Sequence, residues 1–197
     1  MKKFLTILTL ILTFQTPSQA DDIRDFQIEG MSIGDSLLDY LSEKEIKKKM
    51  RSNTSTWYKN KIFISIRIKL EAFKIYDDVG VVFKPNDNNY IIHALEGSLY
   101  YDREINECYK MQKIISSDLE KLFANKVTID RFDREYSGDK SGESKVRYVD
   151  FLFNDGSASR VICYDMSEKF HANNDEDTLY TVVNSKEFMT WLNKNMQ

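Results

Sequence analysis

The chain has 197 residues, of which 42% are hydrophobic and 30% charged, and a formal net charge of −3. This length is enough for one domain with a hydrophobic core, and no stretch rich in proline, glycine or serine suggests a linker. Proteins that bind nucleic-acid backbones need clustered lysine and arginine, whereas here both charge signs are interspersed. We therefore expect no nucleic-acid partner.

Residues 1–20 have the pattern of a cleavable Sec signal peptide. Two lysines precede an apolar run over residues 4–14, and a pattern of small residues that signal peptidase accepts ends at Ala20. The run is shorter than the roughly 20 residues that a helix needs to cross a bilayer. We predict cleavage between Ala20 and Asp21, no lipobox, no permanent membrane anchor and a single domain over residues 21–197.

A first helix is predicted over residues 33–51. Ser32 and Asp35 have the spacing of a helix start, in which the serine caps the helix and the aspartate faces its positive end. Apolar residues then recur at near-helical spacing: Leu37, Leu38, Leu41, Ile46 and Met50.

Three strands are expected to follow. Residues 63–70 alternate strictly between apolar and polar side chains, which is typical of a half-buried strand. Residues 79–84 and 90–101 are also strand-like, and the turn-forming residues 85–89 separate them. The three segments indicate an antiparallel meander.

A long central helix is predicted over residues 104–124, where apolar residues recur every three or four positions. The two cysteines of an exported chain are expected to pair, because an oxidising compartment does not leave exposed thiols free. We predict a Cys108–Cys163 disulfide that stabilises the fold by about 4 kcal/mol. A Cys-x-x-Cys pair and a set of metal-ligating side chains are both missing, so we expect no metal site and no cofactor.

Strand composition returns over residues 127–136, 146–153, 157–164 and 179–183. The Asp-Gly step before residue 157 favours a tight hairpin. The polar stretch over residues 166–177 is expected to be a loop with His171 exposed. A short helix containing Phe188, Met189, Trp191 and Leu192 closes the chain.

These elements predict an α+β fold. The expected antiparallel sheet has about six to seven strands in two meander-like runs. An N-terminal helix, a long central helix and a short C-terminal helix are expected to lie on one face of it.

One short motif suggests catalysis. Residues Gly34-Asp35-Ser36-Leu37 resemble the Gly-Asp-Ser-Leu block of the GDSL (SGNH) hydrolases, in which the serine is the nucleophile. The resemblance implies His171 as its base, although the chain has Glu168 where the family's Asp-x-x-His block has aspartate. The family's Gly-x-Asn-Asp block, which supplies an oxyanion donor, does not occur.

The same segment carries a second resemblance. Residues 28–41 resemble the N-terminal opening of small envelope domains, such as the BamE/SmpA lipoproteins and β-lactamase-inhibitor-like proteins. This resemblance implies helices packed on a small antiparallel sheet and a function in binding other proteins. The chain departs from the pattern because it lacks a lipobox and the Gly-x-Pro that often ends the first helix.

We therefore expect a periplasmic or secreted module that recognises another envelope protein or a small ligand without catalysis. Two alternatives remain: a divergent GDSL-type serine esterase that uses Ser36 and His171, and a purely structural secreted domain. A binding module should carry a concave or flat surface that the core does not need. An esterase should bring Ser36 and His171 together.

Overall fold

The computed structural model describes residues 22–173 and 175–195, so the predicted cleavage site at Ala20 and Asp21 lies outside the described residues. The strands are β1 (Thr56–Trp57), β2 (Ile64–Ile68), β3 (Asp78–Phe83), β4 (Ile92–Tyr100), β5 (Val127–Glu135), β6 (Lys145–Phe153), β7 (Ala158–Asp165) and β8 (Thr178–Asn184). The helices are α1 (Glu43–Lys49), α2 (Ile105–Phe123), α3 (Glu168–His171) and α4 (Lys186–Asn195). In the described part of the chain, no helix is long and apolar enough to span a membrane.

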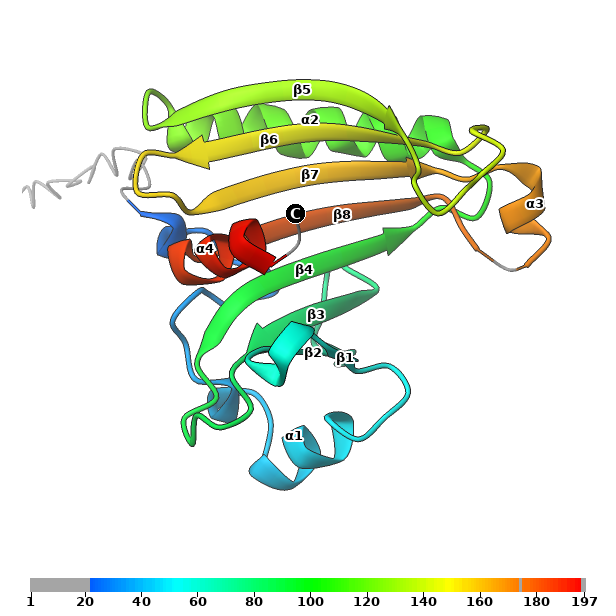
Figure 1. Cartoon of the computed structure of the whole chain (residues 1–197). Helices are drawn as coiled ribbons and strands as arrows, with labels where there is room; N and C mark the ends of the chain where they lie inside the picture. The colour runs from blue at the N-terminus through cyan, green and yellow to red at the C-terminus, as the bar shows by residue number, and fades with distance from the viewer. Residues whose placement is uncertain (1–21, 174, 196–197) are drawn as a thin grey trace, which may run out of the picture.

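The fold is α+β with an antiparallel sheet, as predicted, but the predicted six to seven strands in two runs are wrong. Eight strands form one sheet in the order β1-β2-β3-β4-β8-β7-β6-β5 (Figure 1). The strand β8 pairs with both β4 and β7, and so joins the strands that precede α2 to those that follow it. Alternation along a strand predicts that strand, but it carries no information about pairing partners that are distant in the sequence.

The predicted helix over residues 33–51 is wrong in its first half. Gly34 has φ +94°, a turn conformation that interrupts a helix. Asp35 accepts a hydrogen bond from the backbone N–H of Ser32 at 2.8 Å, and this bond closes the turn. The Gly34 N–H donates to the carbonyl of Ile92, and the Ile92 N–H donates to that of Asp35. The segment is therefore tied to the beginning of β4.

In place of one long helix, the segment forms two short helical elements. A 3₁₀ turn spans Leu37–Asp39, and its N-cap is Ser36. The helix α1 begins after Ser42, whose side chain forms a capping box with Glu45. The apolar spacing that predicted one helix comes mainly from Leu37, Leu41, Ile46 and Met50, which pack against the sheet, whereas Leu38 is exposed.

One face of the sheet, here called the α2 face, is covered by two separate pieces of chain. Residues 22–50, here called the N-terminal cover, pack with β2, β3 and β4 in one apolar cluster. The helix α2 packs with β7 and β8 in a second cluster. Phe26 and Phe123 meet edge to face at 6.1 Å between ring centroids, where the two covers join.

The opposite face, here called the α4 face, carries the last helix. Phe188 and Trp191 of α4 pack against Phe63, Val82 and Ala94. The expectation that all helices lie on one face is therefore wrong, as Figure 1 shows for α2 and α4. Beyond α4 this face carries charged and aromatic side chains. Arg67 pairs there with Asp78 and Glu96 of neighbouring strands, and Tyr164 packs on Tyr180.

The predicted disulfide is confirmed. Cys108 in α2 and Cys163 in β7 are joined, and both residues are fully buried in the cluster beneath α2. The bond links the central helix directly to the middle of the sheet.

Candidate functional site

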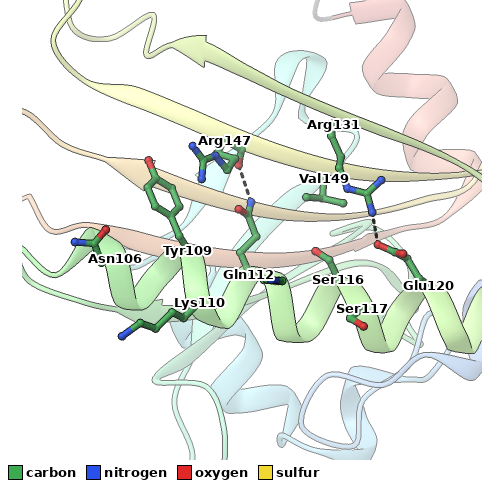
Figure 2. Close-up of a pocket in the computed structure, with 11 residues that line it drawn as sticks. Asn106, Tyr109, Lys110, Gln112, Ser116, Ser117, Glu120, Arg131, Arg147 and Val149 are labelled. Carbon is green, nitrogen blue, oxygen red and sulfur yellow. Dashed lines mark hydrogen bonds and ion pairs between the residues drawn. The ribbon is translucent and has the colours of Figure 1, made fainter.

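A groove runs between α2 and the outer strands of its half of the sheet (Figure 2). It exists because α2 packs on β7 and β8, while β6 and β5 extend beyond the helix. The volume is about 920 Å³, which is within the range of small-ligand sites. The lining residues are Asn106, Tyr109, Lys110, Gln112, Lys113, Ser116, Ser117 and Glu120 of α2, Arg131 of β5, and Arg147 and Val149 of β6. We call this site the α2 groove.

Two polar side chains lie in the middle of the buried stripe of α2, and both line the groove. Gln112 is 3% exposed, and its amide nitrogen donates to the carbonyl oxygens of Arg147 at 3.0 Å and Val161 at 2.9 Å. Ser116 is 4% exposed, and its hydroxyl has no hydrogen-bond partner among the described residues. A buried polar group without a partner costs about 1–3 kcal/mol. The Ser116 hydroxyl is itself enclosed, so the packing of α2 leaves a polar group unsatisfied just behind the groove wall.

Arg147 and Tyr109 form one end of the groove. The guanidinium carbon of Arg147 lies 3.9 Å from the centroid of the Tyr109 ring, in cation–π contact. Its Nε also donates to the Asp133 carboxylate at 3.2 Å, and this hydrogen bond raises the pKa of Arg147. Burial, followed by the nearby charge of Asp165, raises the pKa of Tyr109 to about 12. At neutral pH the end wall thus presents a cation and a neutral phenol.

The other end of the groove is bridged by an ion pair between Arg131 of β5 and Glu120 of α2 (Figure 2). Four basic side chains and one acidic side chain line the groove, in a chain whose net charge is −3. Outside the lining, Glu107 pairs with Lys110 and Asp133 with Arg147, so the surplus of positive charge is small. Exposed ion pairs of this kind contribute only about 0–1 kcal/mol, so a ligand carboxylate can exchange with them.

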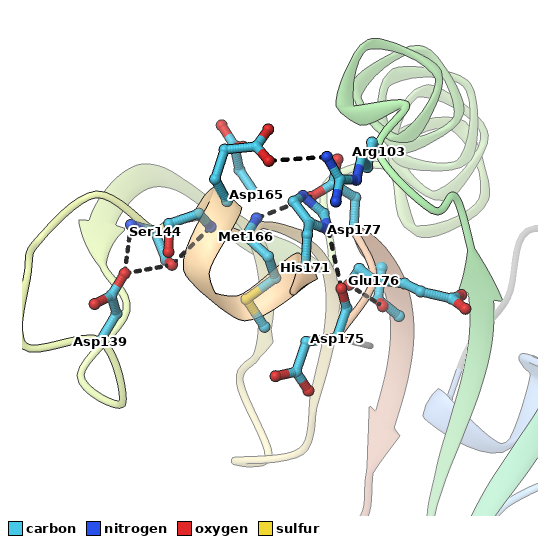
Figure 3. A network of polar contacts seen from close by, with 12 residues as sticks. Arg103, Asp139, Ser144, Asp165, Met166, His171, Asp175, Glu176 and Asp177 are labelled. Carbon is cyan, nitrogen blue, oxygen red and sulfur yellow. Dashed lines mark hydrogen bonds and ion pairs between the residues drawn. The ribbon is translucent and has the colours of Figure 1, made fainter. Parts of the chain in front are cut away.

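A polar network anchors the connections beside the first turn of α2 (Figure 3). Asp177 is 2% exposed, and its carboxylate accepts the Met166 N–H at 2.8 Å. The His171 Nε2 lies 3.5 Å from the same carboxylate, and its Nδ1 lies 2.9 Å from the Asp175 carbonyl oxygen. Burial raises the pKa of Asp177, although the Met166 N–H and His171 favour its ionised form. The backbone of Asp177 also bonds to residues 101 and 102, just before α2.

The network continues into the loop between β5 and β6. Asp139 accepts hydrogen bonds from the hydroxyl and the N–H of Ser144, at 2.6 and 3.1 Å. The Ser144 hydroxyl in turn accepts the N–H of Ser167, just before α3, at 3.0 Å. Hydrogen bonds from Ser144, followed by those from Ser141, hold the pKa of Asp139 well below its usual range. The loops at this end of the sheet are therefore fixed to one another.

Comparison of the chain with protein-family models, with curated proteins and with solved structures gives no match. The resemblance of residues 28–41 to small envelope domains stays a prediction that rests on those residues. The groove is therefore interpreted from its own chemistry.

The structure does not bring Ser36 and His171 together. Ser36 caps the 3₁₀ turn over Leu37–Asp39, which lies in space beside the start of β4. Its hydroxyl donates to the Asn89 carbonyl at 2.7 Å and accepts the Leu38 N–H at 3.2 Å. His171 lies near the opposite end of β4, in the network around Asp177. β4 has nine residues, and at about 3.3 Å per residue the two side chains are about 30 Å apart along it.

The expected loop over residues 166–177 contains the helix α3, and its histidine is not exposed. The side chain of His171 is only 6% accessible, because it is enclosed by the connection that it helps to order. Ser167 accepts its backbone N–H, and Asp175 and Asp177 contact its ring, so composition alone does not predict its burial.

The sequence reasoning missed the groove, although the residues gave a signal. The buried stripe of α2 runs through Cys108, Gln112, Ser116, Leu119 and Phe123. Two polar residues at consecutive core-facing positions of an amphipathic helix indicate that the helix meets a polar surface or a cavity there. Arg131 and Arg147 gave no comparable signal, because alternating charges are common on exposed strands.

Proposed function

We propose that the chain is an exported, non-catalytic binding module that holds an acidic segment of a partner protein in the α2 groove. The observation that carries the proposal is a groove lined by four basic side chains and only one acidic side chain. A purely structural domain has no need of such a groove. The disulfide fits an oxidising compartment, in agreement with the predicted signal peptide.

The chemistry of the groove favours a carboxylate-rich ligand. Lys113 has no ion-pair partner among the described residues, and Arg131 and Arg147 can each exchange an exposed acidic partner for a ligand carboxylate. Arginine binds carboxylates through two parallel hydrogen bonds, which gives direction as well as attraction. The aliphatic Val149 and the ring of Tyr109 give the ligand limited apolar contact.

The test places a photoreactive amino acid at Ser117 in the full chain expressed in its host. Ser117 lines the groove and is exposed, whereas its neighbour Asp118 is exposed but does not line it. We expect a discrete cross-linked partner from position 117 and none from position 118. Equal cross-linking from both positions, or none from either, would contradict the proposal and favour a structural domain.

A second measurement uses a defined probe. We expect an oligoglutamate peptide to bind the mature protein more tightly than an oligoglutamine peptide of the same length, and the difference to fall as salt is raised. The variant Ser117→Trp should block this binding, while Asp118→Trp should not. Both positions are exposed, so both variants should fold.

A further inference from the structure

A second concave site lies where β4 begins and β8 ends, next to α4 (Figure 1). Its volume is about 660 Å³, and it shares no lining residue with the α2 groove. Ile33, Ile91, Ile92 and Trp191 form its apolar part, and Gly34 adds no side chain to narrow it. We call this site the α4 hollow.

Basic and polar side chains border the hollow along one stripe of α4. Lys186, Thr190 and Lys194 recur every four residues, which places them on the same side of the helix. Neither lysine has an ion-pair partner among the described residues. The acid of this helix, Glu187, is already engaged, since it pairs with Lys84 and lies 3.5 Å from Nδ1 of His93. Two unpaired ammonium groups thus stand beside an apolar surface in an acidic chain.

Trp191 forms part of the wall of the hollow, and aromatic neighbours hold its ring in place. Trp191 is 9% exposed, and its indole Nε1 is buried without an acceptor among the described residues. The ring itself is fixed by the stacked Phe188 and by edge-to-face contact with Phe63 and Tyr58. The hollow therefore combines apolar walls with two unpaired positive charges.

We propose that the α4 hollow binds one molecule of a single-chain anionic amphiphile, such as a fatty acid. Its hydrocarbon chain covers Ile33, Ile91 and Trp191, and its carboxylate lies beside the stripe of α4 that runs from Lys186 to Lys194. This assignment satisfies both the apolar walls and the unpaired charges. A second copy of the chain fits less well, because a twofold interface at this site sets the lysines of one copy against the same lysines of the other.

The experiment titrates the mature protein with dodecanoate below its critical micelle concentration. The chain has two tryptophans, so a Trp57→Phe background leaves Trp191 as the only fluorescent indole. We expect saturable binding of one dodecanoate with a change in Trp191 emission. The double variant Lys186→Gln with Lys194→Gln should weaken binding by about tenfold or more, since the charge-assisted contact to the carboxylate is lost.

Two controls separate the contribution of the lysine charges from that of the ligand's hydrocarbon chain. Lys140→Gln with Lys169→Gln removes two exposed lysines elsewhere and should leave the affinity unchanged. Dodecanol should bind the parent protein about as weakly as dodecanoate binds the Lys186/Lys194 variant. Ser117→Trp, which blocks the α2 groove, should not alter dodecanoate binding, so the two sites can fail independently.

Three results would overturn the assignment. If dodecanoate does not bind, or if the lysine variant binds it as tightly as the parent protein, the α4 hollow is not a fatty-acid site. Binding to vesicles of anionic phospholipid without binding to monomeric dodecanoate indicates a membrane surface as the ligand. Concentration-dependent dimerisation that Ile91→Asp abolishes indicates a second copy of the chain.

Discussion

The two covers of the α2 face are held to the same sheet in different ways. The N-terminal cover is mostly irregular, yet seven of its apolar residues are buried against β2, β3 and β4. The helix α2 is regular, but two of its five buried residues are polar, and a disulfide fixes it to β7. Regular secondary structure is therefore not what makes a cover fit closely.

The difference explains where the groove lies. The irregular segment follows the surface of its strands closely, because each turn can place another apolar side chain on them. The straight helix α2 meets the twisted sheet along one stripe and leaves β5 and β6 partly uncovered. The disulfide adds a covalent link to the apolar contacts that α2 makes. The binding site is thus placed where the cover is fixed covalently and packing is incomplete.

Among the changes considered, removing the disulfide should have the largest effect on stability. The variant Cys108→Ala with Cys163→Ala is expected to lower the free energy of unfolding by about 2–5 kcal/mol. Because α2 then loses its covalent link, its amides should exchange hydrogen before those of β2 and β3. Urea unfolding and amide hydrogen exchange measure the two effects.

The wild-type protein under reducing conditions provides the control, and it should lose the same stability. Equal loss of protection in α2 and in β2 and β3, at denaturant concentrations below global unfolding, would show that the two covers open together. The two covers would then not differ in how they are held to the sheet.

The N-terminal cover depends on a polar anchor that should respond to pH. The Glu29 carboxylate accepts backbone N–H groups of residues 74, 75 and 76 at 2.7–2.9 Å. Burial opposes its ionised form, but these three bonds outweigh burial and lower the pKa of Glu29 below its ordinary value of 4.5. The variant Glu29→Gln should lose about 2 kcal/mol at pH 7, since bonds to a charged acceptor are the stronger ones.

The direction of the pH dependence follows from the lowered pKa. The stabilisation by Glu29 is complete above pH 4.5 and is lost as the pH falls through the pKa of the folded state. The difference in Tm between wild type and Glu29→Gln should therefore shrink from pH 7 to pH 3. Glu71→Gln, at an exposed position near the same loop, should show no such trend. A constant difference would mean that the charge of Glu29 does not matter.

The sequence predicts some local elements of the fold much better than others. Strict alternation identified β2, and three-and-four spacing identified α2 almost to its ends. The same spacing failed over residues 33–51, because residues that face a sheet from successive turns can imitate a helical stripe. The φ of Gly34 is set by hydrogen bonds to β4, which are not visible locally.

The candidate site was less predictable than the fold. The disulfide followed from the compartment and the count of two cysteines. The α2 groove depends on how far β5 and β6 extend past the helix, and this depends on the position of β8 in the middle of the sheet. Strand order is a long-range property, so Arg131 and Arg147 could not be assigned to one site from the sequence.

The smallest effect on stability is expected inside the groove itself. Arg131→Gln removes an exposed ion pair with Glu120 and should change the free energy of unfolding by less than about 1 kcal/mol. Its effect on oligoglutamate binding should be larger, with a loss of about tenfold, because a charge-assisted contact to the ligand disappears.

The matched control is Arg134→Gln, on the same strand but on the opposite face, where its guanidinium lies over Phe132. Fluorescence anisotropy of the labelled peptide measures binding, and urea unfolding measures stability. If Arg134→Gln weakened binding as much as Arg131→Gln, non-specific electrostatic attraction to any arginine of β5 would explain the result. A loss confined to Arg131→Gln, with stability preserved, would show that this part of the α2 face serves the ligand and not the core.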